Sequence, residues 1–307
     1  MNSALRDQIL QEWASHGPME EERKSRQKPP EGVDAVRDVP YVDDGKWQHA
    51  LDIFFPKGTR GTLQTVIDIH GGGWMFGTKE LNEYYCMSLA REGVAVVDIN
   101  YTLVPDIDLK GQIAEVVQAL NWVAAHGREH HCNTRSVSVT GDSAGAALAL
   151  LAAVANTNPI AGVPPLSACI DALFLDCPVS CLHAWYERGD EKTRESIAMV
   201  IGSAPEQFRW WDSVDPSGFL VGARLPELML FTAEEDEKYG WQARMLDALL
   251  TSRRIPHQYI VYPKGTRYPL KHVFNVLNPD YPESVEVNRR SLQFFHNAMA
   301  RFSSQRH

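Results

Sequence analysis

The hydrophobic positions of the chain alternate between short apolar runs and longer patterns of helical period. Runs such as 94–99 and 228–231 are almost continuously apolar, as expected for strands buried on both faces. The alternation predicts a mostly parallel sheet with helices on both faces. We predict strands at 36–42, 49–55, 65–69, 94–100, 137–140, 168–175, 227–232 and 257–262. We predict helices at 81–92, 112–126, 144–156, 241–251 and 284–301.

Two segments interrupt this alternation. Residues 1 to about 32 contain a short amphipathic helix followed by a solvated run of mixed charge. Residues 179 to about 215 have a helical pattern rich in aromatic side chains and fall between two core strands. The sequence Asp-Asp-Gly-Lys at 43–46 indicates a hairpin between the first two strands. Without repeats or a Gly/Ser linker, residues 1–307 are best interpreted as one α/β domain with a helical insertion.

Composition excludes several classes of function. The 307 residues are 44% hydrophobic and 22% charged, which is ordinary for a globular protein. A net charge of −9, without a basic block, disfavours nucleic acids and anionic lipid surfaces as partners. The longest uncharged apolar run, 144–155, is too short for the roughly 20 residues that cross a bilayer, so we expect no membrane insertion.

The N-terminus and the cysteines bear on the compartment. Arg6, Asp7 and Glu12 interrupt the apolar pattern at the N-terminus, which disfavours a secretory signal peptide. Five cysteines without a CxxC pair are typical of reduced thiols and do not form a zinc site. We therefore expect a cytoplasmic protein that uses no metal and no cofactor.

The sequence Gly-Asp-Ser-Ala-Gly at 141–145 lies between a predicted strand and a predicted helix. This is the G-x-S-x-G pattern in the context of a nucleophile elbow, where a sharp turn raises the serine hydroxyl above the sheet. The flanking glycines leave room for the neighbouring strand and helix, and the helix N-terminus stabilises negative charge nearby. Ser143 is therefore the predicted nucleophile.

A glycine-rich loop, His-Gly-Gly-Gly-Trp at 70–74, follows the strand 65–69. Consecutive glycines allow backbone N–H groups to approach a ligand closely. A nucleophilic serine needs such donors for its oxyanion, and each contributes about 3–4 kcal/mol. We expect His70 to brace the loop, and Trp74 either to pack in the core or to line a substrate pocket.

A serine hydroxyl needs a histidine base, and the base needs a carboxylate partner. The strand 227–232 is followed by Glu234, Glu235 and Asp236, of which Asp236 is our candidate acid and the two glutamates are its competitors. After the next strand comes His272, the candidate base. Its rivals are His257, which opens a strand and should face away from the rim, and His296, which lies within the final helix.

Together these segments resemble the hormone-sensitive-lipase-like branch of the α/β-hydrolase family of carboxylesterases. The resemblance also includes Leu-Asp-Ile-Phe-Phe-Pro at 51–56 and Asn-Tyr-Thr-Leu-Val-Pro at 100–105, and it extends from about residue 45 to the C-terminus. It implies an α/β-hydrolase fold, a triad of Ser143, His272 and Asp236, and an oxyanion hole from the amides of Gly72, Gly73 and Ala144. It also implies a cap from residues 1–32 and 179–215.

The chain departs from the family pattern at three places. Ala146 stands where a second glycine usually follows the elbow, Glu-Lys-Tyr-Gly-Trp follows Asp236 where Pro-Leu is common, and the loop 263–271 is longer than usual. The second departure lies beside the candidate acid, for which Glu234 and Glu235 are the alternatives, and the third is expected to reshape one wall of the pocket.

The expected function is a serine carboxylesterase acting on small, short-chain, neutral esters. Trp185, Trp210 and Trp211 either line an apolar acyl pocket or pack within the cap. Without an amphipathic lid bearing a large apolar face, a true lipase is disfavoured. Two alternatives remain: an amide or arylformamide hydrolase using the same machinery, and a non-catalytic small-molecule receptor. The expected partner is an ester substrate, and a homo-oligomer is left open.

Overall fold

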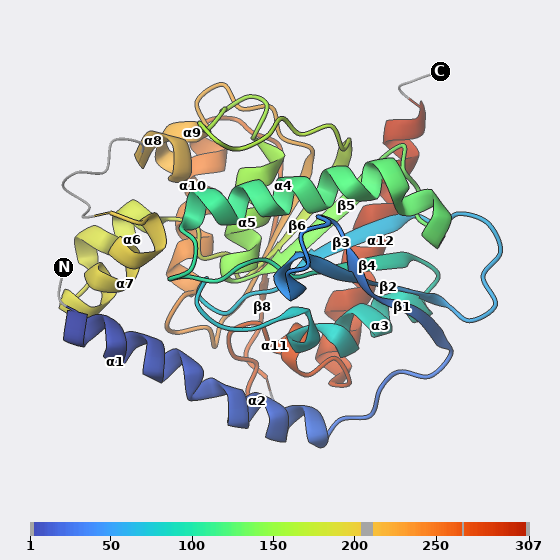
Figure 1. Ribbon diagram of the computed structural model, residues 1–307, viewed down its shortest axis with the longest axis horizontal. Coiled ribbons are helices and arrows are strands. Elements are labelled where there is room, and N and C mark those ends of the chain that lie inside the picture. The colour runs from blue at the N-terminus through green and yellow to red at the C-terminus, as the bar shows by residue number, and fades with distance from the viewer. Residues whose placement is uncertain (1–2, 204–210, 266, 305–307) are drawn as a thin grey trace.

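The computed structural model describes residues 3–203, 211–265 and 267–304. Its centre is an eight-stranded sheet with the strand order β1-β2-β4-β3-β5-β6-β7-β8 (Figure 1). β1 pairs with β2, and β2 pairs with β4, in antiparallel fashion, whereas the remaining pairs are parallel. The strands are β1 Val33–Pro40, β2 Ala50–Pro56, β3 Thr65–Ile69, β4 Ala95–Ile99, β5 Val137–Asp142, β6 Ile170–Asp176, β7 Glu227–Ala233 and β8 Gln258–Tyr262.

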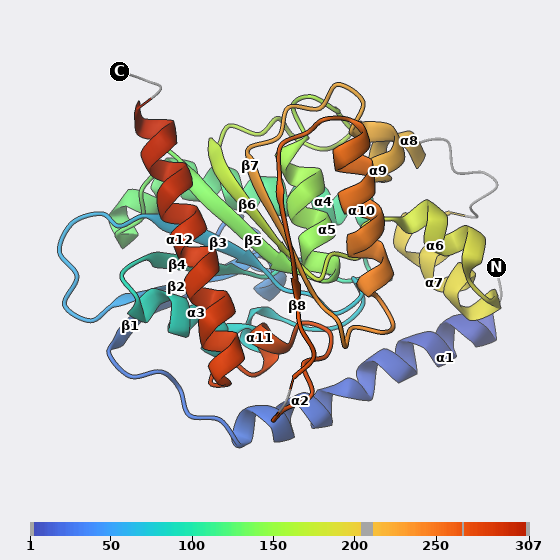
Figure 2. The ribbon, with the colours of Figure 1, turned by 180° about the vertical axis from the view of Figure 1, so that it is seen from behind.

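Helices cover both faces of the sheet. α4, α5 and α10 lie over one face and α3 and α12 over the other (Figures 1 and 2). Successive residues of a strand serve the two layers: Ile53 belongs to the core under α4 and α5, whereas Phe54 belongs to the core under α3 and α12. The larger helices are α3 Glu83–Arg91, α4 Leu109–His126, α5 Ala144–Ala153, α10 Gly240–Ser252 and α12 Pro282–Ser304.

The predicted strands and core helices are present, with shifts of a few residues at their ends. α4 begins at Leu109 instead of 112 because the side chain of Asp108 caps it, accepting a hydrogen bond of 2.9 Å from the N–H of Gly111. The predicted mostly parallel sheet and its α/β-hydrolase topology are confirmed.

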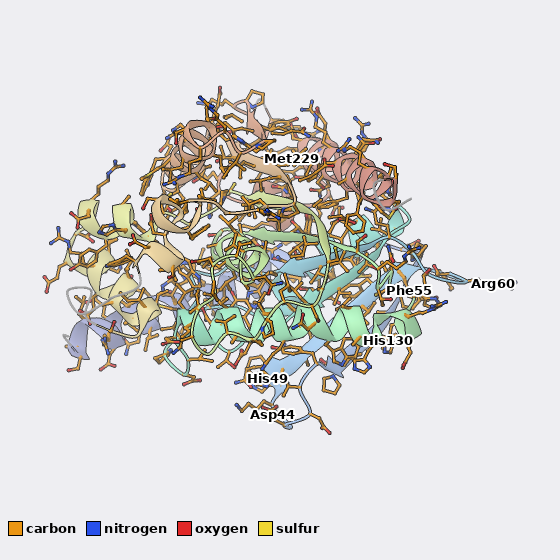
Figure 3. The ribbon with its side chains drawn as sticks, turned by 90° about the horizontal axis from the view of Figure 1, so that it is seen from above. Asp44, His49, Phe55, Arg60, His130 and Met229 are labelled. Atoms are coloured by element: carbon orange, nitrogen blue, oxygen red, sulfur yellow. The ribbon has the colours of Figure 1, made fainter. Side chains whose placement is uncertain are left out.

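The connection between β1 and β2 forms the predicted hairpin. The strands pair from Val33 with Pro56 to Pro40 with Ala50, with a bulge in between. Asp44 and His49 lie beside each other in this connection (Figure 3), and Asp44 Oδ2 is 2.9 Å from His49 Nδ1. A short 3₁₀ helix, η1 Trp47–His49, leads into β2.

Both segments that interrupt the alternation contain helices within their described residues. α1 Ser3–Ala14 and α2 His16–Ser25 run along one side of the molecule, from α7 to the vicinity of α11 (Figures 1 and 2). The solvated mixed-charge run is largely part of α2, in which no residue is buried. The remaining helices are α6 Leu182–Arg188, α7 Glu191–Ile201, α8 Trp211–Val214, α9 Pro216–Phe219 and α11 Phe274–Leu277, with short 3₁₀ helices η2 Lys79–Leu81 and η3 Gly127–His130.

No helix within the described ranges has both the length and the apolar character to cross a membrane.

Candidate active site

Ser143 stands at the junction of β5 and α5, in a backbone conformation that few non-glycine residues adopt. Its φ of 53° and ψ of −114° are sustained by two hydrogen bonds. The Ser143 N–H donates to the carbonyl of Asp176 (2.9 Å), and its carbonyl accepts from the N–H of Val179 (3.1 Å). Such a conformation costs on the order of 1–3 kcal/mol, which the neighbouring strand must offset.

The two glycines of the elbow are required by sterics. A Cβ on Gly145 would overlap the carbonyl oxygen of Ile69, and a Cβ on Gly141 would lie 2.6 Å from the backbone of Gly145. The helix can therefore approach the strands closely enough for the turn to expose the serine. Ser143 is half-buried, whereas its neighbours in the turn are buried.

The structure brings Ser143, His272 and Asp236 together. In the sequence, His272 lies 129 residues after Ser143 and 36 residues after Asp236. His272 Nε2 lies 2.9 Å from Ser143 Oγ, and His272 Nδ1 lies 2.7 Å from Asp236 Oδ2. With its proton on Nδ1, the imidazole donates to the carboxylate and leaves Nε2 as acceptor for the serine hydroxyl. The arrangement can therefore move the hydroxyl proton to the histidine.

Asp236 and His272 differ in their exposure to solvent. The side chain of Asp236 is 1% exposed and that of His272 is 22% exposed. Asp236 Oδ1 also accepts a hydrogen bond of 3.0 Å from the N–H of Tyr239, which fixes the carboxylate. The acid is thus removed from solvent, while the base can be reached by substrate.

The competing acids hold a loop instead. Glu234 Oε2 accepts from the N–H of Lys264 (3.0 Å), and Glu235 Oε2 accepts from the N–H groups of Gly265 (3.0 Å) and Leu270 (2.8 Å). These backbone donors, Leu270 first, lower the pKa of the Glu235 carboxyl. Glu235 therefore braces the long loop that leads to His272, a role that the sequence pattern did not indicate.

The glycine-rich loop lies next to the elbow. Gly72 and Gly73 have φ values of 106° and 60°, and the Gly72 carbonyl accepts from the N–H groups of Met75 (3.2 Å) and Phe76 (3.0 Å). Both glycines are half-buried. Ala144, at the first position of α5, is buried directly after the serine. These backbone amides are the predicted oxyanion donors.

Asp142 ties the loop to the elbow. Its Oδ1 accepts from the N–H of Gly71 (2.9 Å) and from Nδ2 of Asn82 (2.8 Å). Burial raises the pKa of Asp142, and the bonds from Asn82 and Gly71 oppose that shift. The residue between glycine and serine in the motif thus holds two site segments in register, which sequence reasoning missed.

The other histidines lie outside this path. His70 is buried, its Nδ1 lies 2.7 Å from the carbonyl oxygen of Gly71, and its ring stacks on Tyr101. Burial lowers the pKa of His70 to about 4, so this imidazole is neutral in the loop it braces. His257 Nε2 contacts Asp247, and His296 Nδ1 contacts Gln64.

The predicted pocket tryptophans have different surroundings. Trp74 is 2% exposed within the core, which favours its packing interpretation. Trp185 is half-buried and meets the ring of Tyr239 edge-on, and Tyr239 in turn lies 4.8 Å from the ring of His272. Trp211 stacks on His183 within the helical insert. Trp210 lies outside the described residues.

Two clusters in the described part of the chain bring three metal-type ligand atoms within 4.8 Å of one another. In one, Cys177 accompanies Asp236 and His272, which are already hydrogen-bonded. The other comprises Asp68, Cys86 and Asp98, all buried. Burial and the charge of Asp68 raise the pKa of Asp98 well above its usual range. A proton held by Asp98 is therefore an alternative to a metal ion for relieving the repulsion between these two carboxyls. A reaction without metal or cofactor stays a prediction.

Comparison with known proteins identifies a family for the chain. Residues 51–244 match the family model described as BD-FAE. An inhibited crystal structure of esterase B from Lactobacillus rhamnosis is 30% identical, with a TM-score of 0.91 over 99% of each chain.

Curated relatives carry esterase names as well. Versiconal hemiacetal acetate esterase from Dothistroma septosporum is 25% identical over 76% of this chain and 72% of that protein. An acetyl esterase from Salmonella enteritidis is 34% identical, but the match spans 33% of this chain and 31% of the relative. The chain therefore belongs to the BD-FAE family of α/β-hydrolases.

Proposed function

We propose that this protein is a serine carboxylesterase that hydrolyses small, short-chain, neutral esters. Its class, carboxylic ester hydrolase, is supported by its full-length similarity to esterase B. The observation that carries the mechanism is the continuous path from buried Asp236 through His272 to Ser143, with contacts of 2.7 and 2.9 Å.

In the acylation half of the reaction, Ser143 Oγ attacks the ester carbonyl carbon as His272 Nε2 takes its proton. The resulting imidazolium is stabilised by Asp236, which keeps its own charge. When the tetrahedral intermediate collapses, the bond to the leaving oxygen breaks and the alcohol departs with the proton from His272. The acyl group stays on Ser143.

In the deacylation half, water replaces the alcohol. His272 takes a proton from the water as its oxygen attacks the acyl carbon, and returns that proton to Ser143 as the acid is released. In both halves the amides of Gly72, Gly73 and Ala144 receive the oxyanion. Each such donor contributes about 3–4 kcal/mol to the stabilisation of the transition state.

The proposed substrate class is supported by the cap, by the names of relatives and by the net charge of the chain. We assign the cap to the N-terminal helices and to the insert. The two parts are joined by an ion pair of 2.7 Å between Arg6 on α1 and Glu195 on α7. Two relatives are named for acetyl esters, and a second crystal structure of esterase B, 28% identical to this chain, is inhibited by a tributyrin phosphonate. A net charge of −9 favours neutral over anionic esters.

The test is turnover of p-nitrophenyl acetate and butyrate by the wild type and by Ser143→Ala. We expect kcat to fall by about 10⁴-fold or more, because the covalent step is lost. Ser252→Ala is the matched control, since Ser252 is an exposed serine bonded only to the Leu249 carbonyl of its own helix among the interactions described. Undiminished turnover by Ser143→Ala would overturn the mechanism.

The alternatives are separated when the matched amide substrates are added to this assay. An amide or arylformamide hydrolase would show a higher kcat/KM for the amide than for the matched ester. A non-catalytic receptor would turn over neither. The position of His272 against Ser143 favours catalysis over mere binding.

A further inference from the structure

Helix α1 places the ring of Trp13 directly against the oxyanion loop. A Cβ on Gly73 would lie 2.5 Å from Cη2 of Trp13, 3.1 Å from Cε2, and closer still to Cζ2. No side chain fits between the indole and the backbone, so the ring occupies the space that any other residue at this position would fill. Gly73 has a φ of 60°, a conformation that favours glycine.

The same ring contacts the other end of the turn. Trp13 stacks on Phe76, with centroids 6.5 Å apart and ring planes inclined by 22°. Phe76 is bonded to the loop through its N–H, which donates to the Gly72 carbonyl (3.0 Å). His16 lies against both rings, 5.3 Å from Trp13 and 5.8 Å from Phe76. Trp13 thus contacts both Gly73 and the residue that closes the turn around it.

The N-terminal arm, residues 3–27 with helices α1 and α2, is anchored on both sides of Trp13. On one side Ile9 is 1% exposed, Arg6 pairs with Glu195, and Lys192 pairs with Glu12. These contacts join the arm to α7 and hold the indole in place independently of the loop.

On the other side the arm is joined to the end of α11. Nη1 of Arg23 and Nε2 of Gln27 both donate to the carbonyl of Leu277, at 2.5 and 2.6 Å. The arm is therefore fixed at two distant parts of the fold, with the tryptophan between them.

We propose that Trp13 is a positioning residue that holds the Gly73 amide in the orientation required of an oxyanion donor. A loop of three glycines has no side chains with which to fix itself, and each glycine has wide conformational freedom. Efficient transition-state stabilisation needs donors that are already in place when charge develops. The inference rests on the proposed function, because an oxyanion hole requires acyl transfer at Ser143.

A positioning role makes a kinetic prediction that a pocket wall does not. If the indole only contacted the bound ester, its removal would raise KM and leave kcat unchanged. If it orients a donor used in the transition state, its removal lowers kcat and leaves KM almost constant. Affinity for a trifluoromethyl ketone, which forms a tetrahedral adduct with serine, should fall together with kcat/KM.

The experiment compares wild type, Trp13→Ala, Trp13→Phe and Trp122→Ala with p-nitrophenyl butyrate and a trifluoromethyl ketone. Trp122 is a half-buried tryptophan on α4 that contacts His126 and His130, so its removal controls for the loss of a packed indole. For Trp13→Ala we expect kcat to fall about 10- to 100-fold, KM to change by less than about twofold, and the inhibition constant to rise in proportion. Trp13→Phe should recover kcat to within about threefold, and Trp122→Ala should keep kcat while lowering Tm.

Three results would overturn the inference: an unchanged kcat in Trp13→Ala, an effect on KM alone, or no recovery in Trp13→Phe. If Trp13→Ala does not fold, Trp13→Leu is judged by the same criteria, because it retains an apolar side chain without the ring. Failure of the proposed function would be seen separately, because the wild type itself would then show no ester turnover. The inference about Trp13 would be overturned by that result as well.

Discussion

Removal of the Asp142 side chain should damage both stability and catalysis. In Asp142→Ala two buried N–H donors lose their shared acceptor: the backbone N–H of Gly71 and one of the two side-chain N–H groups of Asn82, whose other N–H still donates to Asp68 (2.8 Å). Each buried donor left without a partner costs about 1–3 kcal/mol, so the free energy of unfolding should fall by about 2–6 kcal/mol. That is a large share of the roughly 5–15 kcal/mol by which proteins are usually stable.

The catalytic effect follows from the position of Gly71 beside the oxyanion glycines. Release of its N–H lets the loop shift, and a displacement of about 1 Å at a donor reduces kcat by about 10²-fold. Asp142→Asn is the matched variant, because its carbonyl oxygen can still accept from both donors. It should lose less than half as much stability and keep kcat within about tenfold of the wild type.

The assay is thermal unfolding together with kcat and KM for p-nitrophenyl butyrate, for all three proteins. At roughly 2 °C per kcal/mol for a chain of this size, Tm should fall by about 4–12 °C in Asp142→Ala. The reasoning would be refuted if alanine and asparagine had equal effects, because the hydrogen bonds would then not be the cause.

Three further predictions concern other residues. Burial raises the pKa of Asp176 to about 7, so the contribution of this carboxyl to stability is greatest below about pH 4 and is lost as the pH rises towards 7. The Tm of Asp176→Asn should therefore rise relative to that of the wild type across this interval, and a Tm difference that stays constant with pH would contradict the prediction. Gly145→Ala, whose Cβ would overlap the Ile69 carbonyl, should lower unfolding free energy by about 4 kcal/mol or more, and near-native chemical denaturation would contradict the close approach. Glu235→Ala should free the 263–271 loop and speed its limited proteolysis several-fold, because two backbone N–H groups lose their acceptor. Glu237→Ala, at an exposed position, should not change the rate of proteolysis, and equal cleavage of the two variants would contradict the role given to Glu235.

The sequence predicted the sheet well because strands buried on both faces carry runs that no helical period explains. β3 was predicted to the residue, and β4 to within one residue at each end. Helix ends were harder to predict, since they depend on single capping contacts such as that of Asp108. The sequence also did not predict that the charged run at 20–25 is helical. Its side chains contact residues that are distant in sequence, as Arg23 contacts the carbonyl of Leu277, and the sequence pattern does not record such contacts.

The candidate site was predicted in part, and for an identifiable reason. Ser143, Asp236 and His272 each follow a strand of one parallel sheet, so their loops converge on one edge and sequence order alone brings them near each other. Trp13 carries no such signal, because it lies 60 residues before Gly73 on a helix outside the sheet. The roles of Asp142 and Glu235 depend on which backbone amides face them, and no residue pattern records that.

The central claim is that His272 activates Ser143 as a covalent nucleophile, and its most direct test is labelling with a short-chain alkyl fluorophosphonate followed by peptide mass mapping. We predict one adduct per chain on Ser143 in the wild type, none in Ser143→Ala, and a rate of labelling at least about 10³-fold lower in His272→Ala. An adduct on a different residue, or equally fast labelling in His272→Ala, would contradict the account.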